Sequence, residues 1–162
     1  MKKIPQDGFT LVELLVAIAL FAMLSGLATV SLLSAQHKAS LQSQIATLIA
    51  DTKQQQIKAM QGDTDGRASP DYDGIHFATD SYTLFHGTTF NPDDSTNVTF
   101  PLDGHLQFNN ITFPNDNLIF IPLSGEVYGY SDVTNTVTLQ DPSNNQQQQL
   151  QFNYLGVLTG IN

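Results

Sequence analysis

The chain has 162 residues, 41% of them hydrophobic, and a formal net charge of −9 at pH 7. This length allows one modest domain with its own core, and the lack of cysteine excludes disulfide bonds. All Lys and Arg residues lie at or before Arg67, and an acidic surface repels phosphate backbones, so we expect no direct nucleic-acid binding.

Residues 1–8 are mostly polar and carry two basic side chains, Lys2 and Lys3. So short a segment does not fold alone, and its place before an apolar run predicts a leader that is removed by processing. By the positive-inside rule, the lysine pair keeps the N-terminus in the cytoplasm and sends the C-terminus outside.

Residues 9–33 form an apolar run with a single charged side chain, Glu13. As a helix, this run spans about 37 Å at about 1.5 Å per residue, which is enough to cross a hydrocarbon core of about 30 Å. We therefore predict a transmembrane helix, with any loosening near Ser25 and Gly26. A carboxylate at the membrane centre costs about 2–3 kcal/mol or more, so the sequence predicts a partner for Glu13.

Two plainer interpretations of this run stay open. The first is a secretory signal peptide, with Lys2 and Lys3 as its basic region and Gly26-Leu27-Ala28 as its cleavage site. The second is a simple single-pass anchor. The signal-peptide interpretation leaves Glu13 without a purpose and the apolar run too long, and we give both alternatives less weight.

Residues 34–61 are expected to continue the helix as an amphipathic piece that enters the following domain. Gly62 comes next, and glycine is the usual residue where a helix ends in a left-handed turn. The apolar residues recur at spacings close to three or four; they are Leu41, Ile45, Leu48, Ile49, Ile57 and Met60.

Residues 62–162 predict a β-rich extracellular head domain that opens with a polar loop over residues 62–73. Oxygen ligands from several carboxylates would suit Ca²⁺, but the spacing is not that of an EF-hand, and aspartate is common in turns. A solvated loop is the main interpretation and a calcium site the weaker one. The four carboxylates concerned are Asp63, Asp65, Asp71 and Asp73.

Short runs with a period of two follow Gly74 and predict strands of an antiparallel sheet. The first pair forms a hairpin that turns at Asp80 and Ser81. Residues 141–149, which end in the run Gln146–Gln149, are expected as a polar connection between the last two strands. The further strands are expected over residues 98–100, 106–108, 111–113, 118–121, 127–130, 133–139 and 150–158.

The sequence shows no catalytic constellation. His76 and His86 flank the predicted hairpin and could approach each other across it, while His37 and His105 stand apart in the sequence. The histidines do not have the spacing of a zinc-binding motif, and there is no glycine-rich phosphate loop. We therefore predict a protein that is not an enzyme and needs no metal or cofactor.

The residues Gly8-Phe9-Thr10-Leu11-Val12-Glu13, followed by an apolar run, resemble the N-terminus of type IV prepilins and type II secretion pseudopilins. The resemblance implies cleavage between Gly8 and Phe9 by a membrane peptidase that also N-methylates Phe9. It further implies that Glu13 pairs with the terminal amine of another subunit. Such a pair relieves a buried charge on each side and thereby favours one axial register.

The same resemblance implies an α+β, pilin-like fold. One long N-terminal helix, with a transmembrane half and an amphipathic half, packs on an antiparallel β-sheet head. The partners implied are other pilin or pseudopilin subunits, the prepilin peptidase, and an inner-membrane assembly platform with its ATPase. The stretch from Phe120 to Thr138, with Ile121-Pro122-Leu123-Ser124-Gly125-Glu126 before a predicted strand, is also similar to the C-terminal part of H-type pseudopilins, which favours a minor subunit.

The sequence thus predicts a structural subunit that is held in the inner membrane and then enters an extracytoplasmic filament. The alternative is a membrane-tethered binding module or adhesin that does not polymerise. Whether the filament serves secretion, DNA uptake, motility or attachment stays open.

Overall fold

The structure is a computed structural model that describes residues 9–64 and 66–161. Within these ranges, the side chains of residues 27–31, 33, 34 and 161 are not described. The predicted leader, with Lys2, Lys3 and Gly8, lies outside the described residues, as does Asp65. The chain divides into two compact units, an N-terminal unit, Met1–His37, and a head, Lys38–Asn162.

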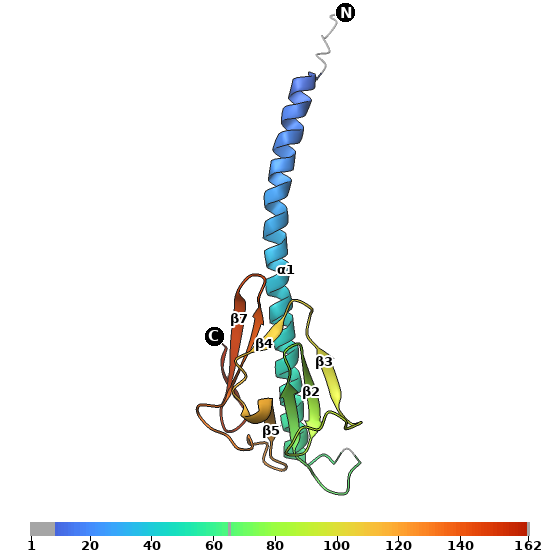
Figure 1. Ribbon diagram of the computed structural model, residues 1–162, viewed down its shortest axis with the longest axis vertical. Helices are drawn as coiled ribbons and strands as arrows, with labels where there is room; N and C mark the ends of the chain where they lie inside the picture. The colour runs from blue at the N-terminus through green and yellow to red at the C-terminus, as the bar shows by residue number, and fades with distance from the viewer. Residues whose placement is uncertain (1–8, 65, 162) are drawn as a thin grey trace, which may run out of the picture. The chain divides into compact units, whose positions relative to one another are not determined.

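One helix, α1 (Leu11–Gln61), contributes to both units (Figure 1). It ends where the sequence predicts, because Gly62 has a φ of +65°, a left-handed conformation that glycine adopts without steric cost. The N–H groups of Gly62 and Asp63 donate to the carbonyl oxygens of Ala59 and Lys58, each at 3.0 Å. This Schellman motif satisfies carbonyl groups that lack partners inside the helix.

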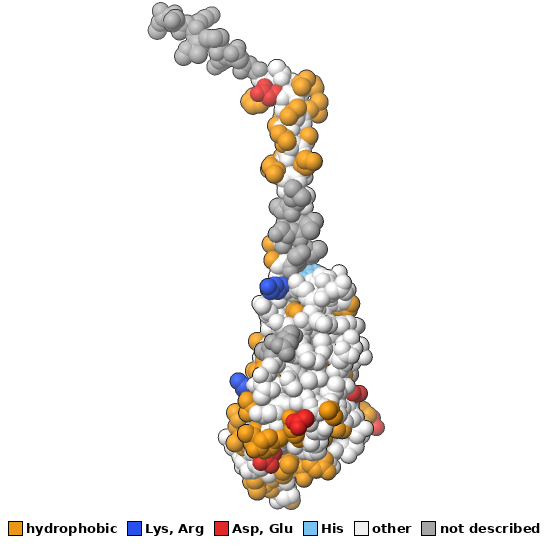
Figure 2. Space-filling view, turned by 90° about the vertical axis from the view of Figure 1, so that its left-hand side faces the viewer, with side chains coloured by type: hydrophobic (Ala, Val, Ile, Leu, Met, Phe, Trp, Pro, Cys, Tyr) orange, Lys and Arg blue, Asp and Glu red, His pale blue; other side chains and the backbone are white. Residues whose placement is uncertain are grey.

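Within the head, α1 buries one face, and this face differs from the predicted one toward the end of the helix. Figure 2 shows hydrophobic side chains gathered on the surface at that end of the head. Ile57 and Met60 were expected to be buried but are exposed, because the buried positions advance by alternate steps of four and three residues and pass between them. The buried positions are Leu41, Ile45, Leu48, Thr52, Gln55 and Ala59.

The first sheet has four antiparallel strands in the order β3-β2-β1-β5. Strands β1 (Asp73–Phe77) and β2 (Ser81–His86) form the predicted hairpin. Strand β3 (Val98–Pro101) lies at one edge and β5 (Asn117–Phe120) at the other. Pro101 has no N–H to donate, and its place at the end of an edge strand makes that donor unnecessary.

The second sheet also has four antiparallel strands, in the order β4-β6-β7-β8. Between β4 and β5 the chain returns to the first sheet through a short 3₁₀ segment, η1 (Pro114–Asp116). The strands of the second sheet are β4 (Gln107–Asn109), β6 (Thr136–Asp141), β7 (Gln146–Phe152) and β8 (Leu158–Ile161). The fold is therefore α+β, with antiparallel sheets, as predicted.

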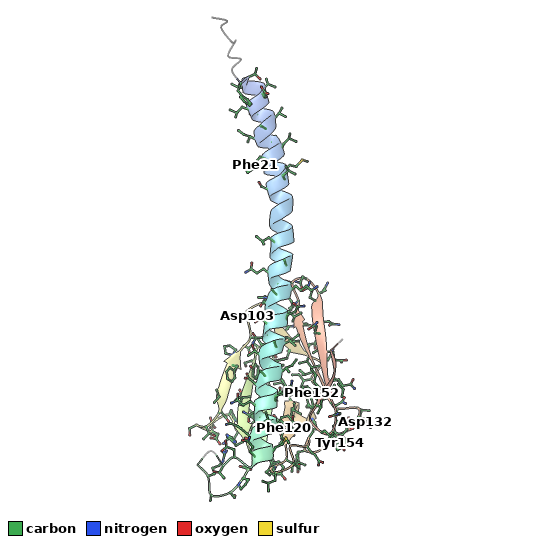
Figure 3. All side chains as sticks on the ribbon, turned by 180° about the vertical axis from the view of Figure 1, so that it is seen from behind. Phe21, Asp103, Phe120, Asp132, Phe152 and Tyr154 are labelled. Carbon is green, nitrogen blue, oxygen red and sulfur yellow. The ribbon has the colours of Figure 1, made fainter. Side chains whose placement is uncertain are left out.

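One hydrophobic core joins the head part of α1 to both sheets. Phe77 of the first sheet packs edge to face on Phe108 of the second, with ring centroids 5.2 Å apart. Phe113 lies against Phe152 with centroids 6.0 Å apart. Figure 3 labels Phe152 together with Phe120 of β5, and both side chains are buried. Large aromatic rings thus fill the space where the two sheets meet.

The strand predicted over residues 111–113 is wrong. Thr112 holds this segment to the start of β6, because its N–H and its Oγ1 both donate to the carbonyl oxygen of Thr136, at 2.9 and 3.1 Å. Pro114 follows at once and cannot donate to a ladder. The segment is therefore fixed by local hydrogen bonds and does not continue as a strand.

The strand predicted over residues 127–130 is also wrong. Val127 makes a single antiparallel bridge with Phe120 of β5. Gly129 has a φ of +65° and takes the chain out of the extended conformation. One bridge next to a turn does not make a strand, although Val127 itself is buried in the core.

The glutamine run Gln146–Gln149 was expected in a connection but forms the first half of β7. The turn lies before it, at residues 142–145, and the run pairs in register with β6. Gln147 is exposed and the other three glutamines are half-buried, which is compatible with a strand that Leu150 and Phe152 anchor in the core. The strand predicted over residues 150–158 is divided between β7 and β8 by a turn.

Candidate functional site

Helix α1 begins at a capped turn formed by Thr10. The Oγ1 of Thr10 accepts a hydrogen bond from the backbone N–H of Glu13 at 3.2 Å, and the Leu14 N–H donates to the carbonyl oxygen of Thr10 at 3.1 Å. Thr10 is therefore the N-cap and Glu13 the third helical residue, which is the Thr-x-x-Glu spacing of a capping box. The sequence contains this signal, but our sequence interpretation assigned no role to Thr10.

Phe9 lies immediately before this turn. Its side chain is 81% exposed, and neither Phe9 nor Thr10 is helical. Gly8, the other partner of the predicted cleavage site, lies outside the described residues. A cleavage before Phe9 would leave a terminal amine one residue ahead of the N-cap of the helix that carries Glu13.

The described side chains of the N-terminal unit are largely apolar and exposed. Phe21, labelled in Figure 3, stands out from the helix with 74% of its surface exposed. A helix that is apolar on every side needs apolar surroundings, which this unit does not supply by itself. The other exposed large side chains include Leu11, Val12, Leu14, Leu15, Val16, Ile18, Leu20, Met23 and Leu24.

Within the described residues, no helical segment combines the length and the apolarity of a membrane crossing. The span over residues 9–33 stays a prediction.

In the head, a cavity of about 380 Å³ lies between α1 and the strands β2 and β3. Next to it, the Tyr82 hydroxyl donates to Oδ2 of Asp51 at 2.5 Å. Burial of the phenol and this hydrogen bond raise the pKa of Tyr82 above its ordinary value. The Tyr82 hydroxyl therefore stays protonated near pH 7 and does not act as an acid or a base there. Its hydrogen bond to Asp51 links α1 to the first sheet. The cavity is lined by Asp51, Gln54, Gln55, Lys58, Leu84, His86, Thr96, Val98 and Phe100.

Asp73, one of the four aspartates considered for calcium, is buried in the head. Its Oδ1 lies 3.0 Å from Nδ1 of His86, which is opposite it in the β1–β2 ladder. The Asp71 carboxylate accepts the N–H of Tyr72 at 2.8 Å. Among the described residues, Asp63, Asp71 and Asp73 do not form a group of ligand atoms within 4.8 Å of one another. These three aspartates therefore do not form a calcium site by themselves. Because Asp65 lies outside the described residues, the four-aspartate site stays a prediction.

The predicted approach of His76 and His86 is wrong, because the two side chains lie on opposite faces of the first sheet. His86 is opposite Asp73 and His76 is opposite Thr83, and alternate positions of a strand point to opposite faces. The His76 ring stacks on Phe90, with centroids 4.0 Å apart. His86 therefore contacts Asp73 and His76 contacts Phe90, and the two histidines do not form a common site.

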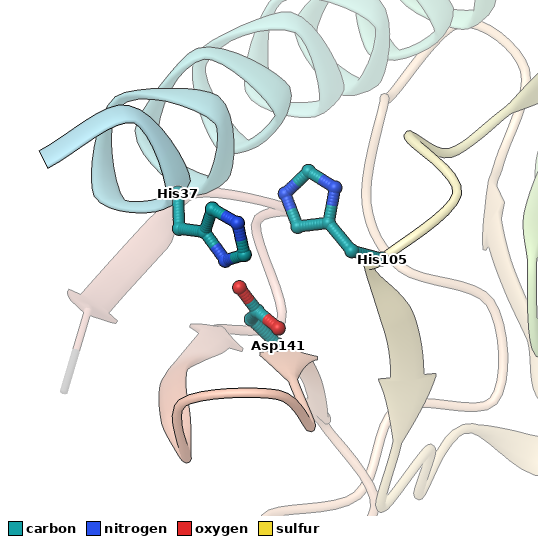
Figure 4. Close-up of side chains that lie close together, drawn as sticks. All are labelled: His37, His105 and Asp141. Carbon is teal, nitrogen blue, oxygen red and sulfur yellow. The ribbon is translucent and has the colours of Figure 1, made fainter. Parts of the chain in front are cut away.

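His105 and Asp141 of the head are brought together although they are far apart in the sequence. Their possible ligand atoms lie within 4.8 Å of each other; Figure 4 draws both, together with His37, which belongs to the N-terminal unit. Asp141 is fully buried, and its Oδ1 accepts from the N–H and the Oγ of Ser143 at 2.9 and 2.6 Å. No sequence spacing signals this pair, and two ligands alone do not complete a metal centre.

Comparison with known proteins identifies the N-terminal segment. Residues 5–29 match the family model described as the prokaryotic N-terminal methylation motif, the signal motif of type IV pilins and pseudopilins. The match includes Phe9, the capping residue Thr10 and Glu13. No curated protein and no solved structure matches the chain. The motif indicates a type IV pilin-like precursor that a prepilin peptidase processes.

Proposed function

We propose that the chain is a structural subunit of a type IV pilus or of a type II secretion filament. It is made as a precursor, cleaved after Gly8, N-methylated at Phe9 and assembled with other subunits. The observation that carries the proposal is the methylation motif over residues 5–29. The role is structural, with no catalytic residue and no cofactor.

The start of α1 supports cleavage between Gly8 and Phe9. Phe9 and Thr10 precede the helix, so this bond lies outside the helical hydrogen-bond ladder. The residue that caps the helix, Thr10, belongs to the mature chain. Removal of the leader therefore leaves the helix start intact, since capping needs no group from the leader.

The charge that cleavage creates gives Glu13 its role. A helix N-terminus carries a partial positive charge, so an added amine at Phe9 is unfavourable there unless a carboxylate lies near. Glu13 lies in the first turn of the same helix, where it can meet the amine of a neighbouring subunit. Breaking a buried pair by removing one partner costs about 3–5 kcal/mol, which is enough to select one axial register.

The apolar N-terminal unit supports the membrane and filament stages of this function. Residues 9–33 hold the precursor in the inner membrane until an assembly platform and its ATPase extract it. Side chains such as Leu11, Phe21 and Leu24 then pack against neighbouring subunits. Burying one such side chain fully is worth about 1.5–3 kcal/mol, so an array of them stabilises a filament core strongly.

The head faces outward and contacts neighbouring subunits. It carries no Lys or Arg after Arg67, which makes it an acidic surface that repels phosphate backbones. We infer a minor subunit from the similarity of residues 120–138 to H-type pseudopilins.

The test is the intact mass of the protein purified from the membrane of the cells that make it. The wild type should begin at a methylated Phe9, and Gly8→Val should retain residues 1–8. Glu13→Ala should be processed normally but be absent from sheared filaments. Glu13→Asp, which keeps the charge on a shorter side chain, is the matched control and should be partly incorporated.

Two results would contradict this function. One is a wild-type mass that still includes Met1 to Gly8, and the other is cleavage after Ala28. In either case a tethered or secreted binding module becomes the better assignment.

A further inference from the structure

The end of the head that holds the last turns of α1 exposes large apolar side chains. We name this surface the end patch and define it by Met60, Leu123, Tyr128, Val133, Tyr154 and Leu155. Val133 and Leu123 are 81% and 72% exposed. We propose that the end patch binds a second subunit of different sequence, one that presents an apolar side chain flanked by Lys or Arg. The inference rests on the proposed function, which supplies the filament in which such a subunit is met.

The residues of the end patch come from three segments of the chain that touch one another. A side chain at Gly125 would meet Met60 and one at Gly62 would meet Leu123, so the helix end and the 121–133 loop touch. The N–H of Val127 donates to the carbonyl oxygen of Tyr154 at 2.8 Å, which joins the 153–157 turn to the same loop. Large exposed apolar side chains gathered at one end of a domain indicate an interaction site.

Leu123, one of the two most exposed residues of the end patch, is held by its backbone. Leu123 has a φ of +66°, a conformation that is costly for a bulky residue. Its N–H donates to the carbonyl oxygen of Ala59 at 2.7 Å, which ties it to the last turn of α1. Its apolar side chain is thus presented to solvent by a fixed backbone. A surface that is already ordered loses little conformational entropy when a partner binds.

A small cavity beside the end patch offers room for one anchoring side chain. Its volume is about 220 Å³, and its walls include Ile49, Phe152 and Val157. Gln56 and Gly156 also line it, and the Gln56 amide donates to the carbonyl oxygens of Gly125 and Leu155, at 3.0 and 2.5 Å. The cavity therefore opens next to the loops that carry the end patch. Apolar anchors in such pockets carry most of the binding energy at interfaces.

The charges around the end patch decide which partner fits. Glu126 and Asp132 are exposed on the loop that carries Leu123 and Val133, and Figure 2 shows acidic side chains among the hydrophobic ones at this end of the head. Asp132 accepts a hydrogen bond from the Tyr130 hydroxyl at 2.8 Å, and this bond raises the pKa of Tyr130. Figure 3 labels both Asp132 and Tyr154.

No Lys or Arg lies in the 121–133 or 153–157 segment. On α1, Lys53 lines the cavity beside the end patch, and Lys58 in the last turn lines the other cavity, between α1 and the strands β2 and β3. A second copy of this head would bring acidic loops together, which is unfavourable, whereas basic side chains beside an apolar anchor complement both features.

The experiment places a photo-crosslinking residue in the full chain, in the cells that make it. Leu123 and Val133 are each replaced by p-benzoyl-phenylalanine, and Asn144, exposed at the turn between β6 and β7, is the matched control site. We expect one product from both patch sites and not from the control. It should contain a different protein, crosslinked at a segment with Lys or Arg beside apolar residues. The double variant Glu126→Gln, Asp132→Asn should lower its yield severalfold.

Three results would overturn the inference. They are equal yields at the patch and control sites, a product formed with a second copy of this chain, and a yield that the double variant leaves unchanged. The mature mass and the presence in sheared filaments are measured in the same samples. If these are normal while crosslinking fails, the end patch is not a docking surface; if they are abnormal, it is the proposed function that fails.

Discussion

The two parts of helix α1 use the same kind of side chain in opposite ways. In the N-terminal unit Leu14 is 55% exposed, whereas in the head Leu48 is 1% exposed. The head stabilises its part of the helix by tertiary contacts inside one chain. The large apolar side chains of the N-terminal unit named above are exposed, and under the proposed function they are buried in a membrane or against other subunits. The comparison shows that burial within the chain stabilises the head part of α1, whereas the apolar side chains of the N-terminal unit do not gain stability in this way.

The largest expected effect on stability follows from removing a buried leucine of the head part of α1. Leu48→Ala should lower the free energy of unfolding by about 2–5 kcal/mol, through lost burial and the cavity that remains. The measurement is urea unfolding of the full chain in detergent, followed by the near-ultraviolet circular dichroism of its five tyrosines, all of which lie in the head.

Leu14→Ala is the matched control for this comparison. The same substitution, at an exposed position of the same helix, should change the free energy of unfolding of the head by less than about 0.5 kcal/mol. Equal losses from the two variants would show that the N-terminal unit is coupled to the folding of the head.

A smaller effect is expected from Tyr82→Phe, which removes the hydrogen bond to Asp51. A hydrogen bond to a charged group contributes about 1.5–3 kcal/mol, so the loss at pH 7 should lie in this range. Because the pKa of Tyr82 is raised in the folded head, its stabilising contribution is present below pH about 10 and is lost as the pH rises further.

The measurement for Tyr82→Phe is the free energy of unfolding between pH 7 and pH 11, from far-ultraviolet circular dichroism. Wild-type stability should fall more steeply above pH 10 than that of the variant. Parallel curves would show that ionisation of Tyr82 does not contribute to the loss of stability at high pH.

The capped start of α1 predicts a local effect of about 1 kcal/mol. Thr10→Ala removes the side chain that accepts the Glu13 N–H, and losing such a cap costs about 0.5–2 kcal/mol. Hydrogen exchange at the amides of the first turn should become faster in detergent, while the head amides stay unchanged. Thr10→Ser keeps the hydroxyl, and its exchange should match the wild type.

The smallest effect is expected at the end patch. Val133→Ser should change the free energy of unfolding by less than about 0.5 kcal/mol, because the side chain is exposed and supports no core contact. Urea unfolding tests this directly. A clear loss of stability would place Val133 with the buried residues of the head and not with the exposed ones of the N-terminal unit.

The end of the helix, the first hairpin and the N-terminal motif could be predicted from the sequence, because strong local signals define them. Gly62 marked the end of the helix, where it has the left-handed conformation that glycine adopts without steric cost. The hairpin also formed as expected, although its turn lies at residues 78–80 and Ser81 already belongs to β2. The methylation motif identified the N-terminal segment from the sequence itself, because the order of its residues is specific.

Elements that depend on distant partners were not predictable. Gln146–Gln149 are polar, but β6 supplies a backbone ladder and the core takes only alternate residues of β7. Ile57 and Met60 looked like core residues, whereas Thr52 and Gln55 occupy the buried face. In the head, His105 and Asp141 meet only because the second sheet folds. Periodicity reports local preference, and tertiary packing overrules it where the two conflict.

The way α1 runs through the head has a mechanical meaning. Its buried face extends from Leu41 to Ala59, and the 121–125 loop grips its last turns through hydrogen bonds to Ala59 and from Gln56. A tensile load along the axis of α1 acts on all these contacts at once, in shear, and does not break them one after another. Failure then requires the whole face to slip together. The head should therefore resist a load along its helix better than a load that peels the helix away.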